Sequence, residues 1–184
     1  MACPVSLDDE LIPRIRAGDE AAFDALVRRH YNGLCVFAAR MTRSDATAEE
    51  LVQDVLLRVW QHHEEWAVSG SVAAYLYAAV RNTALNHVRR ERYLERWQAG
   101  AAAQADAPRV PEADEDVRAA ELAAALERAI DELPLRCRQV FILRRQHHMS
   151  CAEVARVMQI APKTVEIQMG LAIKALRRKL AHLL

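Results

Sequence analysis

The chain has 184 residues, of which 52% are hydrophobic, 27% are charged and 5% are aromatic. Ala, Leu, Glu and Arg dominate, and runs of alternating β-branched residues are missing, so the composition favours helices over strands. The formal net charge is zero. The sequence therefore predicts an all-α protein with enough apolar material for one medium core or two small ones.

Cys3, Cys35, Cys137 and Cys151 are scattered along the chain. They form neither a C-x-x-C pair nor a Cys/His block, which argues against a disulfide framework and against a structural metal. The first residues lack an export signal, and no apolar run approaches the roughly 20 residues that span a bilayer. We expect a cytoplasmic protein without membrane insertion, metal or cofactor.

The zero net charge hides four segments of alternating sign. Residues 1–80 carry 7 Lys and Arg against 12 Asp and Glu, and residues 81–98 carry 5 against 2. Residues 99–117 carry 1 against 5, and residues 118–184 carry 12 against 6. This order predicts at least two surfaces for polyanions and one for a basic partner.

The N-terminal part predicts two helices with recognisable N-caps. Asp19 precedes an apolar repeat that runs to Met41, and Ser44 precedes a second repeat that starts near Ala48. The second helix buries one full stripe and turns another stripe outward, where Leu57 lies among polar residues. The outward stripe consists of Glu50, Asp54, Leu57 and Gln61.

A loop after Trp66 leads to Ser71, a candidate N-cap for a third helix that runs to about Trp97. One stripe of this helix carries polar and basic side chains of the kind that bind nucleic acid. These are Asn82, Asn86, Arg89 and Tyr93, with Arg81, Arg90 and Arg92 beside them. Residues 98–117 are rich in Ala, Pro and acid without periodicity, which predicts a flexible acidic linker between two domains.

Residues 118–184 predict a four-helix domain that ends in a helix-turn-helix. Ser150 and Glu153 have the spacing of a capping box, and Pro162 suits the first position of the helix after the turn. Ala155 supplies the small residue where the two helices touch. A helical hairpin without a DNA role is the alternative for this segment.

Catalysis is not indicated. His62, His63, His147 and His148 lie in adjacent pairs that point about 100° apart on a helix, so neither pair chelates a metal easily. They are interpreted as solvated or helix-end histidines. A Gly-rich phosphate loop, a nucleophile elbow and paired carboxylates are all missing from the sequence.

Four motifs, in this order and spacing, resemble the extracytoplasmic-function sigma factors of bacterial RNA polymerase. The resemblance covers about residues 6–182. The motifs are AEELVQDVLLRVW (48–60), AYLYAAVRNTALNHVRRER (74–92), LPLRCRQVFILRR (133–145) and CAEVARVMQIAPKTVE (151–166). The resemblance implies sigma domain two over residues 1–97, a linker over 98–117 and sigma domain four over 118–184. The two domains together would bind core polymerase and recognise two promoter elements.

The resemblance assigns a role to each predicted surface. The outward stripe would bind the β′ clamp helices of the polymerase, and the loop with the third helix would read the minus-ten element and open it. The polymerase-binding residues are then Glu50, Gln53, Asp54 and Leu57. The minus-ten residues are Trp66, Ser71, Arg81, Asn82, Asn86, Arg89 and Arg90.

The helix-turn-helix would read the minus-thirty-five element. Its expected DNA-binding residues are Lys163, Thr164, Glu166, Gln168, Lys174, Arg177 and Arg178. Many members of the family have a Gly where this chain has Gln159, and basic or hydroxylic residues where it has Glu166, Ile167, Gln168, Leu171 and Ile173. We therefore expect a weak minus-thirty-five contact. Further expected partners are the β flap of the polymerase and an anti-sigma factor.

Two alternatives use the same features. A free-standing helix-turn-helix repressor or activator would need an N-terminal sensor pocket or dimer seam, and the N-terminal half shows an acidic face and a basic helix instead. A purely structural interaction protein would not need the basic C-terminal domain.

Overall fold

The computed structural model describes residues 8–68, 70–98 and 117–181, and the predicted linker lies outside them. The N-terminal domain contains α1 (Leu11–Arg16), α2 (Glu20–Thr42), α3 (Asp45–Gln61), the short 3-10 helix η1 (His63–Glu65) and α4 (Val72–Gln98). The C-terminal domain contains α5 (Val117–Asp131), α6 (Leu135–Arg145), α7 (Cys151–Met158) and α8 (Pro162–Leu180). The described residues form no strand, which confirms the all-α prediction.

The predicted caps start the predicted helices. Asp19 accepts a hydrogen bond from the backbone N–H of Ala22, and Ser44 accepts one from Thr47. Ser150 and Glu153 form both bonds of the capping box at the start of α7, and Pro162 is the first residue of α8. Each cap satisfies donors that a helix leaves without a partner at its N-terminus, so local chemistry sets these boundaries.

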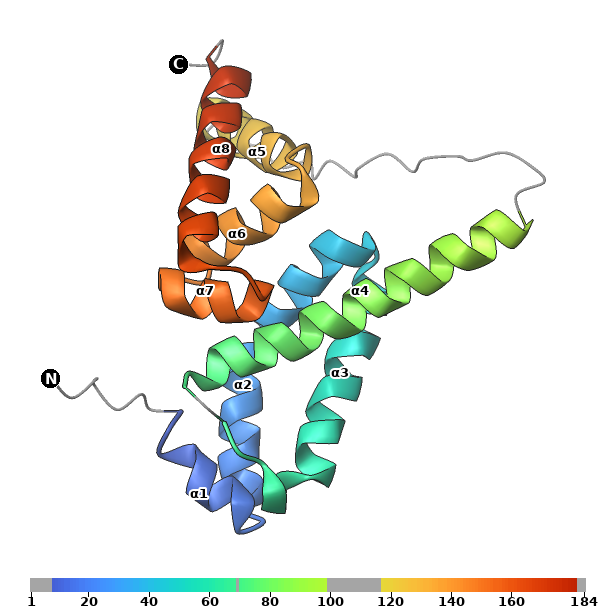
Figure 1. Ribbon diagram of the computed structural model, residues 1–184, viewed down its shortest axis with the longest axis vertical. Coiled ribbons are helices and arrows are strands. Elements are labelled where there is room, and N and C mark those ends of the chain that lie inside the picture. Colours follow the sequence, from blue (N-terminus) through green and yellow to red (C-terminus); the bar gives the residue numbers. More distant parts are fainter. Residues whose placement is uncertain (1–7, 69, 99–116, 182–184) are drawn as a thin grey trace, which may run out of the picture.

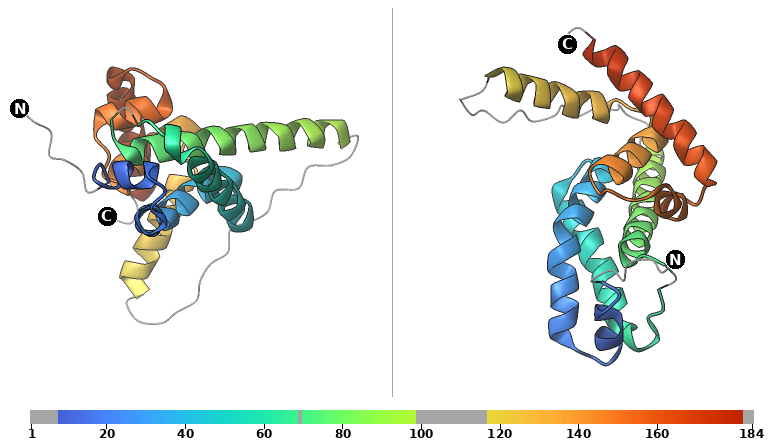
Figure 2. Two further views of the ribbon diagram at one scale, coloured as in Figure 1. Left: turned by 90° about the horizontal axis from the view of Figure 1, so that it is seen from below. Right: turned by 90° about the vertical axis from the view of Figure 1, so that its left-hand side faces the viewer.

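Three long helices build the N-terminal domain (Figure 1). α2 packs against α3 and α4 and buries Leu26, Leu34 and Phe37, while α3 contributes Val52. The short elements α1 and η1 were not predicted, and they contact each other at the end of the bundle where α2 begins. The second half of α4 extends away from the other helices (Figure 2).

α7 and α8 form the predicted helix-turn-helix. Val154, Met158 and Val165 are buried between them, and Ala155 is 6% exposed at their contact. Gln159 ends α7 in the left-handed conformation, with φ 54° and ψ 47°. That conformation is costly for any residue with a Cβ, which explains why a Gly suits this position.

The two domains touch each other directly. α7 lies across the first half of α4, and α6 lies near the end of α2 (Figures 1 and 2). Buried side chains of both domains belong to one continuous apolar cluster. None of the helices in the described ranges has the length and apolar character of a membrane span.

We expect Gln159→Gly to raise the free energy of unfolding by about 0.5–1 kcal/mol, because Gly adopts the left-handed conformation without a Cβ clash. The matched control is Gln146, which ends α6 in the right-handed helical region with φ −88°. There the change to Gly should lower the free energy of unfolding by a similar amount, because only the added flexibility remains. Urea unfolding followed by circular dichroism measures both, and equal effects at the two sites would contradict the strain assignment.

Candidate nucleic-acid and polymerase interfaces

A cleft of about 570 Å³ opens between α3, the loop after η1 and the first half of α4. Trp66, Asn82 and Asn86, which were predicted from separate parts of the sequence, all line it. Ala67 belongs to the predicted loop, and the remaining walls were not predicted: Val55, Arg58, Val59, His62, Glu65, Tyr75, Ala79 and Thr83. The cleft therefore combines amide, aromatic and charged groups in one place.

Tyr75 is the aromatic side chain that is open to solvent in this cleft. Its ring is 39% exposed and meets the ring of Trp66 edge-on, with 5.9 Å between the centroids. Trp66 itself is only 5% exposed, and its indole N–H has no hydrogen-bond partner within the described part of the chain. Trp66 thus forms the wall that supports Tyr75, whereas the sequence indicated a direct contact. Tyr75 lies seven residues before Asn82, so the helical period already placed both on one face.

Some of the predicted minus-ten residues line the cleft, and the others lie outside it. Asn82 and Asn86 line the cleft, and Arg89 and Arg90 are exposed further along α4. Ser71 caps α4 by accepting a hydrogen bond from the backbone N–H of Ala74. Arg81 is half-buried and turns toward the C-terminal domain, where its Nε donates to Gln139 Oε1 at 3.4 Å. Burial, together with the nearby charges of Arg136 and Arg89, lowers the pKa of Arg81.

The predicted polymerase-binding stripe is exposed on α3. Leu57 is 53% exposed, and Glu50, Gln53 and Asp54 are exposed beside it. Gln53 and Leu57 also line an apolar groove of about 700 Å³ between α2 and α3. The groove includes Phe23 and Trp60, whose ring centroids are 5.0 Å apart, and Gln53 donates to the Tyr31 hydroxyl at 3.3 Å. Acidic side chains next to an exposed apolar groove suit a basic helical partner.

The reading helix α8 presents a different surface from the predicted one. Glu166 pairs with Lys163 at 2.8 Å, and this pair raises the pKa of Lys163. Gln168 is half-buried and accepts a hydrogen bond from the Cys137 thiol at 3.0 Å. Thr164 is half-buried in the first turn, and Lys174, Arg177 and Arg178 are exposed toward the C-terminus. The outward face carries Ile167 and Leu171, which are 53% and 51% exposed.

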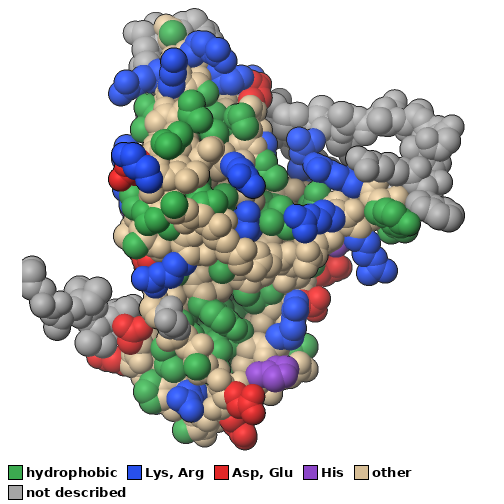
Figure 3. Space-filling model, in the orientation of Figure 1, with side chains coloured by type: hydrophobic (Ala, Val, Ile, Leu, Met, Phe, Trp, Pro, Cys, Tyr) green, Lys and Arg blue, Asp and Glu red, His purple; other side chains and the backbone are tan. Residues whose placement is uncertain are grey.

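Charge is unevenly distributed over the visible surface. Lys and Arg side chains occur over the C-terminal domain and along α4, whereas Asp and Glu gather toward the opposite end of the N-terminal domain (Figure 3). Basic side chains on both domains agree with two surfaces for a polyanion.

His147 follows the end of α6, as one of its two interpretations expected, but it is not solvated. Its ring packs against Tyr77 and Phe37, with centroid distances of 4.6 and 6.3 Å. Burial, and then the nearby charges of His148 and Arg40, lower the pKa of His147 to about 4. The imidazole is therefore neutral near pH 7 and is part of the packing between the domains. The described residues contain no group of three or more His, Cys, Asp or Glu side chains arranged to hold a metal.

The two domains match two known family models. The model of Sigma-70 region 2 matches residues 26–93, and the model of Sigma-70 region 4 matches residues 123–176. The first match covers the cleft and the acidic stripe, and the second covers the helix-turn-helix.

Solved structures share the fold of the whole chain. The structure of CnrH in complex with the cytosolic domain of CnrY is similar with a TM-score of 0.68 and 24% identity, over 96% of this chain and 99% of that chain. The sigma factor RpoE of Bartonella quintana, in complex with the anti-sigma factor NepR, is similar with a TM-score of 0.70 and 20% identity, over 86% and 96% of the two chains.

Curated relatives extend over nearly the whole length. The ECF RNA polymerase sigma factor SigM of Mycobacterium tuberculosis H37Rv is 30% identical over 179 residues, which is 96% of this chain and 86% of the relative. SigL of the Erdman strain is 33% identical over 171 residues, or 91% and 93% of the two chains. With both regions matched and such relatives covering nearly the entire chain, the protein belongs to the extracytoplasmic-function sigma factors of RNA polymerase.

Proposed function

We propose that the N-terminal domain binds core polymerase through α3 and captures an unpaired minus-ten base in the cleft beside α4. The observation that carries this proposal is the convergence of Tyr75, Asn82 and Asn86 on one cleft. An exposed aromatic ring offers a stacking surface, and the two amides offer donors and acceptors for a base edge. The exposed Arg89 and Arg90 are suited to hold the phosphates next to the captured base.

Polymerase binding is assigned to the exposed stripe of α3. Gln53 and Leu57 line the apolar groove between α2 and α3, and Glu50 and Asp54 are exposed on the same helix. This surface suits a helix with basic and apolar side chains such as the β′ clamp. The β flap is the proposed partner of the C-terminal domain. One similar solved structure contains an anti-sigma factor, which supports a partner of that kind here.

A sigma factor works on cytoplasmic polymerase, so the proposed location is the cytoplasm. Chemistry belongs to the polymerase, and we expect no reaction to be catalysed by this chain itself. The alternative of a free-standing repressor requires neither an acidic polymerase-binding stripe nor a cleft for an unpaired base.

The minus-thirty-five contact is assigned mainly to phosphate binding. Exposed positive charges along α8 come from Lys174, Arg177 and Arg178. Lys163 forms an ion pair with Glu166 instead. Ile167 and Leu171 can make apolar contacts, for which thymine methyl groups are the matching feature of the major groove.

Asp54→Arg should abolish binding to core polymerase, because a like charge would then face a basic clamp. The matched control is Glu10→Arg, which reverses an exposed acid next to α1. Co-purification with core measures the effect. Wild-type recovery of the Asp54 variant would refute the assignment of α3.

Asn82→Ala should slow open-complex formation roughly ten- to a hundredfold, because one base contact contributes on the order of 1–3 kcal/mol. Closed-complex binding should change little, and a pre-melted bubble template should restore part of the loss. Permanganate footprinting with core polymerase measures melting. Asn32→Ala, at an exposed position on α2, is the matched control. If the Asn82 variant melts duplex promoters like the wild type, the cleft does not capture a base.

Glu166→Gln should strengthen promoter binding by the holoenzyme and make the slope of log K against log salt more negative by about one, because Lys163 is then free to pair with a phosphate. The double variant Lys163→Gln, Glu166→Gln should bring the slope back to that of the wild type. Binding titrations at several salt concentrations measure both. A loss of preference at one base pair without a change of slope would instead assign Glu166 to base reading.

A further inference from the structure

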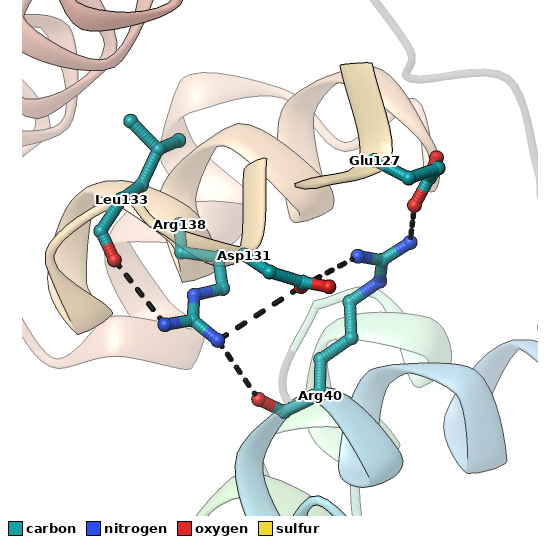
Figure 4. Close-up of polar contacts among 5 residues, drawn as sticks. All are labelled: Arg40, Glu127, Asp131, Leu133 and Arg138. Atoms are coloured by element: carbon teal, nitrogen blue, oxygen red, sulfur yellow. Dashed lines mark hydrogen bonds and ion pairs between the residues drawn. The ribbon is translucent and has the colours of Figure 1, made fainter. Parts of the chain in front are cut away.

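An ion-pair cluster joins the two domains at the end of α2. Arg40 of α2 donates to Asp131 Oδ1 at 3.0 Å and also pairs with Glu127, and both carboxylates belong to α5 (Figure 4). Arg138 of α6 donates to the backbone oxygens of Arg40 at 3.4 Å and Leu133 at 3.3 Å. We call Arg40, Glu127, Asp131 and Arg138 the Arg40 latch. Its arginine side chains are only 17% and 12% exposed, whereas the two carboxylates are about half exposed, so solvent still screens these contacts in part.

Three further polar contacts cross the interface. The Tyr77 hydroxyl lies 2.8 Å from His147 Nδ1, and burial raises the pKa of Tyr77, so this group stays protonated. Gln139, which is 2% exposed, donates to Met41 Sδ at 3.2 Å and accepts from Arg81. Long-range contacts of this kind fix one orientation of the C-terminal domain on α2 and α4.

The same interface engages residues beside the cleft, including Arg81, which the sequence predicted for the minus-ten surface. Arg81 is engaged by Gln139, and Gly70 lies so close to the Arg156 guanidinium that an added Cβ would sit 1.8 Å from its Nη1. Burial raises the pKa of Glu153, but hydrogen bonds from Ser150 and from the Ser71 hydroxyl outweigh burial and lower it overall. The C-terminal domain thus holds the start of α4 and its preceding turn.

Touching domains also cannot reach two promoter elements at once. Elements centred about 25 base pairs apart are separated by about 85 Å along the duplex, at about 3.4 Å per base pair. The longest helix, α4, has 27 residues and is therefore about 40 Å long. With a C-terminal domain roughly 30 Å across, two domains in contact span at most about 70 Å. The closed arrangement therefore has to open before both readers bind, if the proposed function holds.

We propose that the Arg40 latch is autoinhibitory: in the free protein it holds the C-terminal domain against Arg81 and the turn before α4, at the edge of the minus-ten cleft, and its release frees this edge and lets the two promoter readers separate. This inference rests on the proposed function for the identity of this edge. The closed state itself rests only on the contacts between the domains.

The test uses the full chain and a charge swap. Arg40→Asp and Asp131→Arg should each shift the balance toward the open state roughly ten- to a hundredfold, since a lost charged hydrogen bond has about this effect. The double variant should restore closure in part, because the swapped pair forms again while Glu127 and Arg138 each meet a like charge. Arg28→Asp is the matched control, because Arg28 lies on the same helix and pairs with Asp24 inside its own domain. Small-angle X-ray scattering gives the radius of gyration of each protein.

The functional readout is binding of a single-stranded minus-ten oligonucleotide without polymerase. Arg40→Asp removes positive charge, so simple electrostatics predicts weaker binding, whereas release of the latch predicts binding about tenfold tighter. Glu127→Gln with Asp131→Asn should also open the chain, and these carboxylates are 49% and 52% exposed, so the fold should tolerate the change.

Three results would overturn the proposal: a wild type as expanded as the single variants, expansion without tighter binding, or a double variant as open as the single variants. Run-off transcription by the wild type with core polymerase separates this outcome from the proposed function. Loss of that activity would refute promoter-directed initiation, while the scattering data would still report the closed state.

Discussion

One helix, α4, has to satisfy three partners at once, and the rest of the structure follows from how its faces are divided. Leu76, Val80 and Ala84 are fully buried in the N-terminal core. Successive residues rotate by about 100°, so Tyr75, Asn82 and Asn86 fall on a second face, which lines the cleft. Tyr77 and Arg81 fall on a third face, which meets the C-terminal domain. A shift of register along α4 would disturb all three contacts together.

The interface between the domains has features of a contact that opens. The Nε atoms of Arg40 and Arg138 and Nε2 of His147 are buried and have no hydrogen-bond partner among the described residues. Each unpaired donor costs free energy in the closed state and regains a partner in water on opening. Buried ion pairs also contribute less to stability than their geometry suggests, because both charges lose solvation. The interface therefore combines a defined orientation with a modest net stability.

Local sequence patterns predicted the helices well, because caps and apolar periods act within one element. Asp19, Ser44, Ser150 and Pro162 all mark the helix starts that the structure has. The same helical period brought Asn82 and Asn86 to one face and left Leu57 exposed. The short helix α1 escaped prediction because six residues are too few for a periodic signal.

Contacts between distant segments were not predictable in this way. The sequence placed Trp66 and Arg81 on the DNA surface, but the structure buries the indole beside Tyr75 and turns the guanidinium toward Gln139, 58 residues away. His147 was interpreted as solvated or at a helix end, and its burial was missed because nothing in its neighbourhood along the chain indicates Tyr77 as its partner. Such contacts depend on how whole helices meet, and a single sequence carries no periodic signal for them.

The reading helix shows how these two levels of information combine. Its polar residues suggested base contacts, yet Glu166 is engaged by Lys163 and Gln168 by Cys137. What remains exposed is an apolar ridge of Ile167 and Leu171 followed by basic residues toward the C-terminus. Such a helix gains affinity from phosphates and discriminates bases weakly, which a protein anchored elsewhere can tolerate. Because both domains belong to one chain, a weak second contact still adds to the first once the domains have separated.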